Sequence, residues 1–431
     1  MSVRPYLMAT LSLISSIAVA EASGVSLPDT PAAHALGSWL EVFNSGDGAR
    51  IDAFDQSYIP WLSHERAMDL RAHTGGYELQ SVEQGGRLWI IFRATEKASS
   101  KEIIGKLVVK SENPAAINWL SLEDAPVGAE LQKITVDAAE RDRVIEGAAK
   151  LLDELYVFPD VGKKMSAALR KAERRGTYRA ITDGQILAWR LSDDLWILGH
   201  DEHLGVRFSQ QVLPPERPDQ HADADPAARK GIISSNCGFE KAEHLAPNIG
   251  YLKFNEFDDP EICAPTAAAA MNFVADSDAL ILDLRDNHGG GAMVQFIASY
   301  LFAEPTHLND IYWRADNATQ QAWTLPYVPG KKFIAKPVFI LTSKRTFSAA
   351  EDFCYALKNL KRAILIGETT GGGAHPGGPR RIDDHFSIRV PTGRSISPIT
   401  HTDWEGTGVE PDIKVPAADA LTEALKRARR D

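Results

Sequence analysis

The sequence predicts an α/β protein whose carboxyl-terminal part is built on a largely parallel sheet. From about residue 231 to 431, short apolar runs typical of buried strands alternate with helical patterns. These runs are followed by glycine-rich or polar turns, and binding sites in such sheets collect at the carboxyl ends of the strands. Helical periodicity precedes this part, and a region of mixed helix and strand character comes before the helices.

The composition excludes several classes of function. The 431 residues are enough for two or three domains, and 44% of them are hydrophobic. The net charge of −11 argues against nucleic acid as a partner, because phosphate binding needs concentrated Lys and Arg. The glycine-rich segments fit neither a dinucleotide fingerprint nor a Walker loop, and the cysteine spacings fit no zinc motif. We therefore expect no cofactor and no metal.

Residues 1–22 have the pattern of a signal peptide. Arg4 supplies a positive charge, residues 7–20 form an apolar stretch, and small residues near its end fit a cleavage site. The stretch is short for a membrane span, so we expect a periplasmic or secreted protein with no span after cleavage; an uncleaved anchor is the alternative. Export would permit a disulfide, and Cys237 and Cys263, which flank a predicted strand, could pair.

Residues 28–128 predict an α+β domain. A helix over 32–43 ends in the turn signal at residues 44–47, and strand-like runs separated by turns follow it. This order resembles the cone-like fold of nuclear transport factor 2, which implies a helix packed on a curved antiparallel sheet. The expected strands are 77–82, 88–94, 103–109 and 116–122.

Residues 134–208 predict three helices, and residues 231–428 predict the α/β core. The stretch 210–230 is rich in Pro, Asp and Ala and predicts an exposed linker. Pro265 suits the first position of a helix, where its missing N–H costs nothing. The expected helices are 137–155, 161–174, 183–196, 265–276, 292–302 and 348–360, and the expected core strands are 250–254, 279–284, 338–341 and 363–366.

Ser348 stands between a buried strand and a helix, where a serine can serve in two ways. The apolar run 337–342 precedes it, and apolar residues at helical spacing follow it. A serine hydroxyl there is close to helix amides that stabilise an oxyanion, so it can act as a nucleophile. It can equally cap the helix, which is a common role of serine. Glu351, one turn further on, is expected to cap the helix or form a salt bridge.

Other residues could complete a serine hydrolase site. A nucleophilic serine needs a base, an orienting carboxylate and amides for the oxyanion. Residues 289–291 are consecutive glycines after a predicted strand, which permits close backbone approach to a ligand. The candidate bases are His203, which precedes an apolar strand, and His288 and His375, which lie in glycine-rich loops. Glu405, flanked by an aromatic residue and a tight turn, is a candidate acid.

Several motifs together resemble serine peptidase family 41. They are found in residues 282–290, 346–351, 367–376 and 408–412, and they follow the order of that family. The family includes the C-terminal processing (tail-specific) proteases, the tricorn core and interphotoreceptor retinoid-binding protein. The resemblance covers roughly residues 135–425. It implies a ClpP/crotonase-like α/β catalytic core with an amino-terminal helical subdomain.

The resemblance also implies a catalytic arrangement. Processing proteases of the family use a Ser/Lys dyad, but residues 371–373 are glycines where the lysine is expected. His203, Ser348 and Glu405 instead match, in order, the three places of a tricorn-like arrangement. His203 would then remove the proton from Ser348, and Glu405 would orient the base directly or through a neighbour. The implied oxyanion amides are those of Gly289, Gly290 and Ala349.

The resemblance implies two classes of function. Only about 40 residues separate Phe208 from Gly250, too few for the peptide-binding PDZ domain of processing proteases. The chain is therefore closer to the branch of the family that lacks a PDZ domain.

The first function is an exported serine peptidase acting on short peptides or unfolded proteins, with esterase activity as a variant. The second is a non-catalytic carrier of retinoids or lipids on the same scaffold. The natural substrate and the oligomeric state do not follow from these residues.

Overall fold

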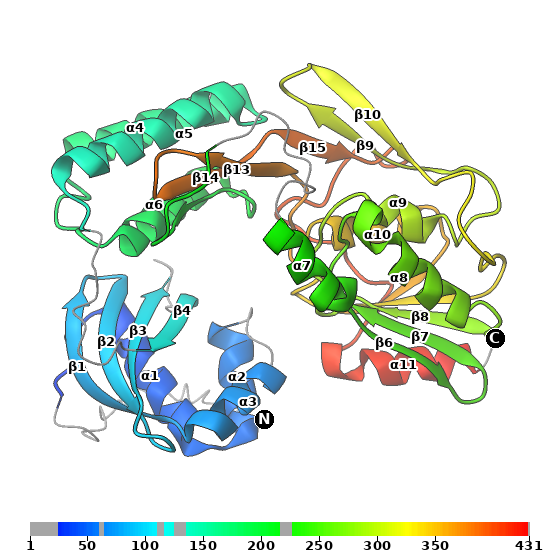
Figure 1. Ribbon diagram of the computed structural model, residues 1–431, viewed down its shortest axis with the longest axis horizontal. Coiled ribbons are helices and arrows are strands. Elements are labelled where there is room, and N and C mark those ends of the chain that lie inside the picture. Colours follow the sequence, from blue (N-terminus) through cyan, green and yellow to red (C-terminus); the bar gives the residue numbers. More distant parts are fainter. Residues whose placement is uncertain (1–24, 60–63, 110–115, 125–134, 216–225, 430–431) are drawn as a thin grey trace, which may run out of the picture. The chain divides into compact units, whose positions relative to one another are not determined.

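The computed structural model describes most of the chain from residue 25 to residue 429. Contacts divide it into the units Met1–Leu131 and Gln132–Asp431, which we describe separately (Figure 1). The expected signal peptide lies outside the described residues. Within the described part, no helix combines the length and the apolar character needed to cross a membrane. The residues outside the described part are 1–24, 60–63, 110–115, 125–134, 216–225 and 430–431.

The first unit packs a helix against an antiparallel sheet. Trp39 and Phe43 lie on the buried face of α1 (Pro31–Ser45), and their rings stack on Tyr77 of the first strand. The predicted helix and the four predicted strands are confirmed, and the strands pair in chain order. Two further helices were not predicted, because their sequences lack a continuous apolar face. The other elements are α2 (Gly48–Tyr58), α3 (His64–Thr74), β1 (Tyr77–Gly85), β2 (Trp89–Glu96), β3 (Glu102–Val109) and β4 (Ile117–Asp124).

The second unit begins with the predicted helices. Asp137 and Asp183 cap two of them, because their carboxylates accept hydrogen bonds from amides three residues further on, at 2.8 and 3.0 Å. The apolar residues of these helices recur at helical spacing and are buried. The chain then turns sharply into a short strand. The elements are α4 (Ala138–Leu155), α5 (Pro159–Arg174), α6 (Gly184–Gly199) and β5 (Gly205–Phe208).

The core of the second unit is a sheet in the order β16-β12-β11-β8-β7-β6, parallel except for β6. Its central strands are apolar throughout because both faces are covered. Leu282 and Ile340 face the layer that contains α8 and α10, whereas Ile281 and Leu341 face α11 (Figure 1). The elements are β6 (Phe239–Leu245), β7 (Ile249–Phe254), α8 (Pro260–Phe273), β8 (Ala279–Asp283), α9 (Met293–Ala298), β11 (Val338–Thr342), α10 (Ala349–Asn359), β12 (Ile364–Gly367), β16 (Ile413–Lys414) and α11 (Ala420–Ala428).

Two small sheets complete the unit and carry parts of the site. In one of them, β5 pairs with β14 (Phe386–Pro391), and Val206 lies opposite Ile388. This pairing ties the segment that follows the helices to the core, and His203 lies just before it. The sheets have the orders β13-β14-β5 and β10-β9-β15, with β9 (His307–Trp313), β10 (Ala318–Trp323), β13 (Gly377–Arg381), β14 (Phe386–Pro391) and β15 (Gly393–Ile396).

The structure corrects three expectations about local structure. Pro265 lies inside α8 rather than at its start, because Asp259 caps the helix and Pro260 takes the first turn. The expected linker is partly helical, since α7 covers Pro226–Ser234. The helix expected over 292–302 is shorter, because α9 ends at Ala298.

Cys237 and Cys263, whose pairing the sequence left open, form a disulfide. It joins the segment before β6 to α8 across 26 residues of sequence. Cys354 is buried and unpaired.

We expect Cys237→Ala/Cys263→Ala to lower the free energy of unfolding of the second unit by about 3 kcal/mol, because the open loop has more entropy when unfolded. Chemical denaturation of both proteins measures this difference, and Cys354→Ala is the control for losing a thiol alone. Equal unfolding midpoints with and without the disulfide would contradict the expectation.

Candidate active site

Ser348 lies at the turn between β11 and α10 and is the first residue before the helix. Its backbone has φ 56° and ψ −120°, a conformation that residues with a side chain rarely adopt. This sharp turn places the hydroxyl beside a histidine from a distant part of the chain. Ser348 Oγ lies 2.9 Å from His203 Nε2. The serine and the base expected from the sequence are therefore in hydrogen-bond contact.

Glu351 holds the turn around Ser348 in place. The side chain is fully buried, and its carboxylate accepts hydrogen bonds from the amides of Ser348, Gly372 and Gly373 at 2.9, 2.7 and 2.8 Å. The hydroxyl of Thr370 also donates to it, at 2.5 Å. Burial raises the pKa of Glu351 to about 7, and the donated hydrogen bonds oppose this rise. The carboxylate therefore joins the turn before α10 to the loop after β12.

The glycine-rich loop after β8 lies directly against Ser348. The amide of Gly289 donates to the Asn287 side chain at 2.9 Å, so it is already used within the loop. Within the described part of the chain, no hydrogen bond is seen from the amides of Gly290 and Ala349. A Cβ on Gly290 would lie 2.2 Å from the carbonyl oxygen of Phe257, so only glycine fits this position. These two amides are the available donors beside the serine.

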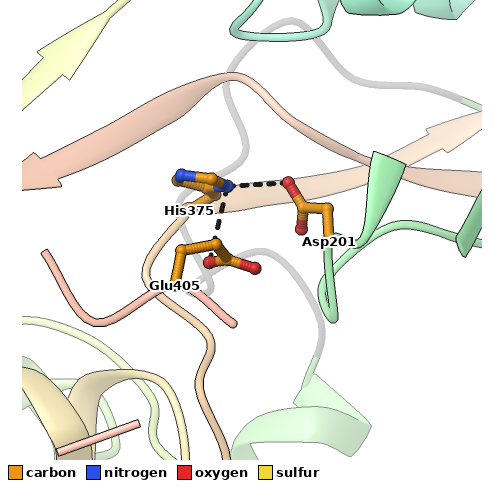
Figure 2. A group of neighbouring side chains, drawn as sticks. All are labelled: Asp201, His375 and Glu405. Carbon is orange, nitrogen blue, oxygen red and sulfur yellow. Dashed lines mark hydrogen bonds and ion pairs between the residues drawn. The ribbon is translucent and has the colours of Figure 1, made fainter. Parts of the chain in front are cut away.

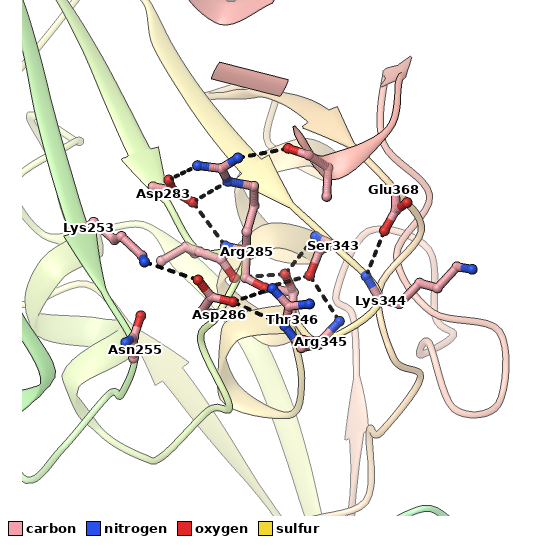
Figure 3. A network of polar contacts seen from close by, with 12 residues as sticks. Lys253, Asn255, Asp283, Arg285, Asp286, Ser343, Lys344, Arg345, Thr346 and Glu368 are labelled. Atoms are coloured by element: carbon pink, nitrogen blue, oxygen red, sulfur yellow. Dashed lines mark hydrogen bonds and ion pairs between the residues drawn. The ribbon is translucent and has the colours of Figure 1, made fainter. Parts of the chain in front are cut away.

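A polar network joins the loop after β8 to the loop after β11, as Figure 3 shows. Asp286 contacts Arg345, with Nε at 3.0 Å from Oδ1, and Lys253 at 3.0 Å. Thr346 Oγ1 donates to the carbonyl of Leu284 at 2.8 Å. Both loops follow neighbouring parallel strands, so these contacts fix the glycine loop relative to the serine turn.

His203 is placed by buried neighbours. The ring lies against Phe347, with 4.8 Å between ring centroids, and the side chain is only 6% exposed. Burial lowers the pKa of His203 to about 4, with the Arg389 charge acting in the same direction and Asp201 opposing it. The imidazole is therefore neutral near pH 7 and can accept a proton. Its Nδ1 has no hydrogen-bond partner among the described residues.

Glu405 lies near His203 without contacting its ring. Figure 2 shows the carboxylates of Asp201 and Glu405 both approaching the same ring nitrogen of His375, with Nδ1 2.8 Å from Asp201 Oδ2 and 3.4 Å from Glu405 Oε2. Burial lowers the pKa of His375, but the two carboxylates outweigh it and raise the pKa overall. Asp201 Oδ1 in turn accepts the backbone amide of His203 at 3.0 Å. Glu405 thus reaches the segment that carries the base through His375 and Asp201, and its Oε1 also accepts the backbone amide of Glu202 at 3.4 Å.

A cavity of about 360 Å³ opens beside Ser348 and His203. The glycine loop and α9 line one part of it, and β9, β10 and β15 line another. Most of the lining side chains are apolar or uncharged; one carboxylate, that of Asp352, also belongs to it. A peptide or another elongated ligand could therefore approach the serine through this cavity.

Comparison with known proteins identifies the family. The model of peptidase family S41 matches residues 248–415, and the model of the N-terminal domain of this family in eukaryotic IRBP matches residues 130–241. The chain belongs to peptidase family S41. The family recognised from the sequence motifs is thereby confirmed, and the matches include Ser348, His203 and Glu405.

Individual relatives agree with this family. Carboxyl-terminal-processing peptidase 1 of Arabidopsis thaliana chloroplasts is 29% identical over 192 residues, which are 44% of this chain and 38% of the relative. The carboxyl-terminal-processing protease of Synechocystis is 26% identical over 165 residues, 38% of this chain and 37% of the relative. The matches therefore span little more than a third of these S41 relatives. Among solved structures, the photosystem II D1 C-terminal processing protease aligns with a TM-score of 0.42 and 16% identity over 67% of this chain and 96% of its own.

Sequence reasoning missed two parts of this S41 site. His375 was considered as a base, but it lies between Asp201 and Glu405 rather than beside Ser348. Asp201 was not considered, although its place two residues before His203 could have suggested a role. His288, the third candidate base, lies in the loop after β8, directly before Gly289, and its side chain is exposed.

Proposed function

We propose that this protein is an exported serine peptidase that cleaves peptide bonds through an acyl-enzyme on Ser348. One observation carries the proposal: the hydroxyl of Ser348 is 2.9 Å from the neutral, buried imidazole of His203. A nucleophile within hydrogen-bond reach of a base is the geometry that acyl transfer requires. The substrates are short peptides or unfolded proteins, whose extended chain can reach the serine at the cavity.

His203 acts as the general base and then as the general acid. Nε2 accepts the proton of Ser348 Oγ as the oxygen attacks the carbonyl carbon of the peptide. The negative charge on the carbonyl oxygen is stabilised by the amides of Gly290 and Ala349 and by the amino terminus of α10. The imidazolium then protonates the leaving amine. In the second half, His203 removes a proton from water as the water oxygen attacks the acyl carbon. The imidazolium then returns this proton to Ser348 Oγ as the bond between Oγ and the acyl carbon breaks, which releases the acid product and restores the serine.

Glu405 supports the base from a distance in this proposal. It contacts His375, which contacts Asp201, which in turn holds the backbone of His203. Asp201 also accepts a hydrogen bond from the hydroxyl of Tyr156 at 3.0 Å. We assign Glu405 and Asp201 as positioning residues, since they fix the segment that carries the base and do not reach the reacting atoms.

The proposal extends to location and to the finer fold. The pattern of residues 1–22 and the disulfide Cys237–Cys263 both support export to an oxidising compartment, the periplasm or the cell exterior. The parallel sheet with both faces covered supports a ClpP/crotonase-like core. The order of α1 and the following antiparallel strands supports a fold like that of nuclear transport factor 2 for the first unit.

A carrier of retinoids or lipids is the second candidate. The observation that favours it is the cavity, whose lining includes Val294, Ile311 and Trp404. A carrier needs no nucleophile–base pair, so the contact between Ser348 and His203 favours the peptidase.

Labelling with a fluorophosphonate probe decides between the two candidates. We expect the mature wild-type protein to gain one probe mass on Ser348, Ser348→Ala to gain none, and the exposed control Ser234→Ala to react like wild type. A peptide library then shows cleavage by wild type only. An unlabelled wild type that binds retinol or fatty acid equally well with and without Ser348 would replace the peptidase by the carrier.

A further inference from the structure

Asp352 is a carboxylate in the wall of the cavity beside the nucleophile. It lies on α10, one turn after Ser348, and lines the same cavity as Ser348 and His203. One of its oxygens, Oδ1, accepts a hydrogen bond from Asn309 Nδ2 at 2.8 Å. That contact fixes the direction of the side chain and leaves Oδ2 available to a ligand.

The charge of Asp352 is not balanced inside the cavity. Among the described residues that line it, none is Lys or Arg, and the other titratable side chain is His203, which contacts Ser348. No salt bridge to Asp352 is formed within the described part of the chain. Burial raises the pKa of Asp352 to about 7, and the hydrogen bond from Asn309 opposes the rise. A carboxylate in such surroundings is stabilised by a ligand that brings its own cation.

The rest of the lining suits a long side chain with a polar end. Ile311, Trp313 and Ala322 offer apolar surface to a methylene chain. Gln320 and Gln321 of β10 add uncharged polar groups. Each Oε1 accepts one hydrogen bond from a tryptophan Nε1, at 3.3 and 3.2 Å, and has a second lone pair for a ligand. The volume of about 360 Å³ is at the lower end of ligand pockets, so it suits one side chain better than a large hydrophobic molecule.

We propose that this cavity receives a lysine or arginine side chain of the substrate, from the residue that flanks the scissile bond, and that Asp352 selects it by pairing with the cation. This inference rests on the proposed peptidase function, because it assigns the specificity of the same site. A charge-assisted hydrogen bond to this half-buried carboxylate is strong enough to distinguish lysine from an uncharged side chain of equal length.

Matched peptides test the inference by binding, without cleavage. They are identical except for lysine, norleucine or glutamate at the position next to the bond that the library shows to be cut, or at each position in turn if none is cut. Fluorescence anisotropy on the Ser348→Ala protein measures their affinities. We expect the lysine peptide to bind on the order of tenfold more tightly than the norleucine peptide, and the glutamate peptide to bind most weakly.

Variants connect this preference to Asp352. In the Ser348→Ala background, we expect Asp352→Asn to bind lysine and norleucine peptides about equally. The matched control is Asp278→Asn, which removes an exposed carboxylate just before β8, at the opposite end of that strand from the site. We expect it to keep the lysine preference. Circular dichroism and unfolding midpoints establish that each variant is folded.

The outcomes separate this inference from the proposed function. Labelling of Ser348 with equal or stronger binding of the norleucine peptide overturns the role of Asp352 and leaves the peptidase in place. Absence of labelling with tight, Asp352-dependent binding of the lysine peptide overturns the peptidase and supports the cation-selective cavity. A lysine preference that survives Asp352→Asn also overturns the inference.

Discussion

His203→Ala is expected to lower kcat/KM for peptide hydrolysis by at least about a thousandfold. The hydroxyl of Ser348 contacts His203 Nε2 at 2.9 Å. Among its described contacts, no other side chain could take its proton. Without the base, the serine attacks as a neutral alcohol and the leaving amine receives no proton. Steady-state kinetics on a peptide that wild type cleaves measures the loss.

The pH profile makes this prediction specific to the base. Burial holds the pKa of His203 at about 4, so the imidazole accepts protons above that pH and is protonated below it. We expect wild-type kcat/KM to fall as the pH is lowered through about 4, and the residual activity of His203→Ala to lack this limb. The exposed His73→Ala serves as the control and is expected to behave like wild type. A variant without His203 that keeps wild-type activity would rule out this base.

Glu351→Ala is expected to destabilise the second unit by at least about 3 kcal/mol and to abolish probe labelling of Ser348. The change leaves the amides of Ser348, Gly372 and Gly373 and the hydroxyl of Thr370 without their acceptor in a buried place. Each such donor costs about 1–3 kcal/mol when it stays unpaired. The serine turn and the loop after β12 then lose the group that holds them together. Chemical denaturation and the labelling rate measure the two effects.

Two comparisons sharpen this experiment. Glu304→Ala removes an exposed glutamate from the same unit and is expected to change neither stability nor labelling. Glu351→Gln keeps the shape of the side chain but turns an NH₂ group towards two donors, so we expect it to destabilise the unit as well. If Glu351→Ala unfolded at the same denaturant concentration as wild type, the carboxylate would have no structural role in the turn.

The sequence alone predicted the parts of this site that depend on local pattern. The strand before Ser348 and the helix after it are visible as an apolar run followed by helical spacing, and the motif order placed His203 in the same site. The places of Cys237 and Cys263 on either side of a strand allowed a disulfide without deciding it, and the structure contains it. Such features involve neighbours along the chain, or motifs that the S41 family shares.

Other parts depend on contacts that no local pattern encodes. Asp201 and His375 are 174 residues apart in sequence, and only the packing of the segment before β5 against the loop after β12 brings them together. The hydrogen bond from the Gly289 amide to the Asn287 side chain depends on the conformation of the loop. The sequence does not determine that conformation, because glycine permits many backbone angles. Pro265 was placed at a helix start because proline suits the first helical position, but Pro260 takes that position behind the cap at Asp259.

The backbone of Ser348, at φ 56° and ψ −120°, has a consequence for how this protein can evolve. A residue with a side chain occupies such a conformation at a cost of about 1–3 kcal/mol, whereas glycine does so freely. Selection for thermal stability alone would therefore favour losing the very hydroxyl that faces His203. The conformation of this turn and the contact with His203 thus place opposite demands on the residue at position 348.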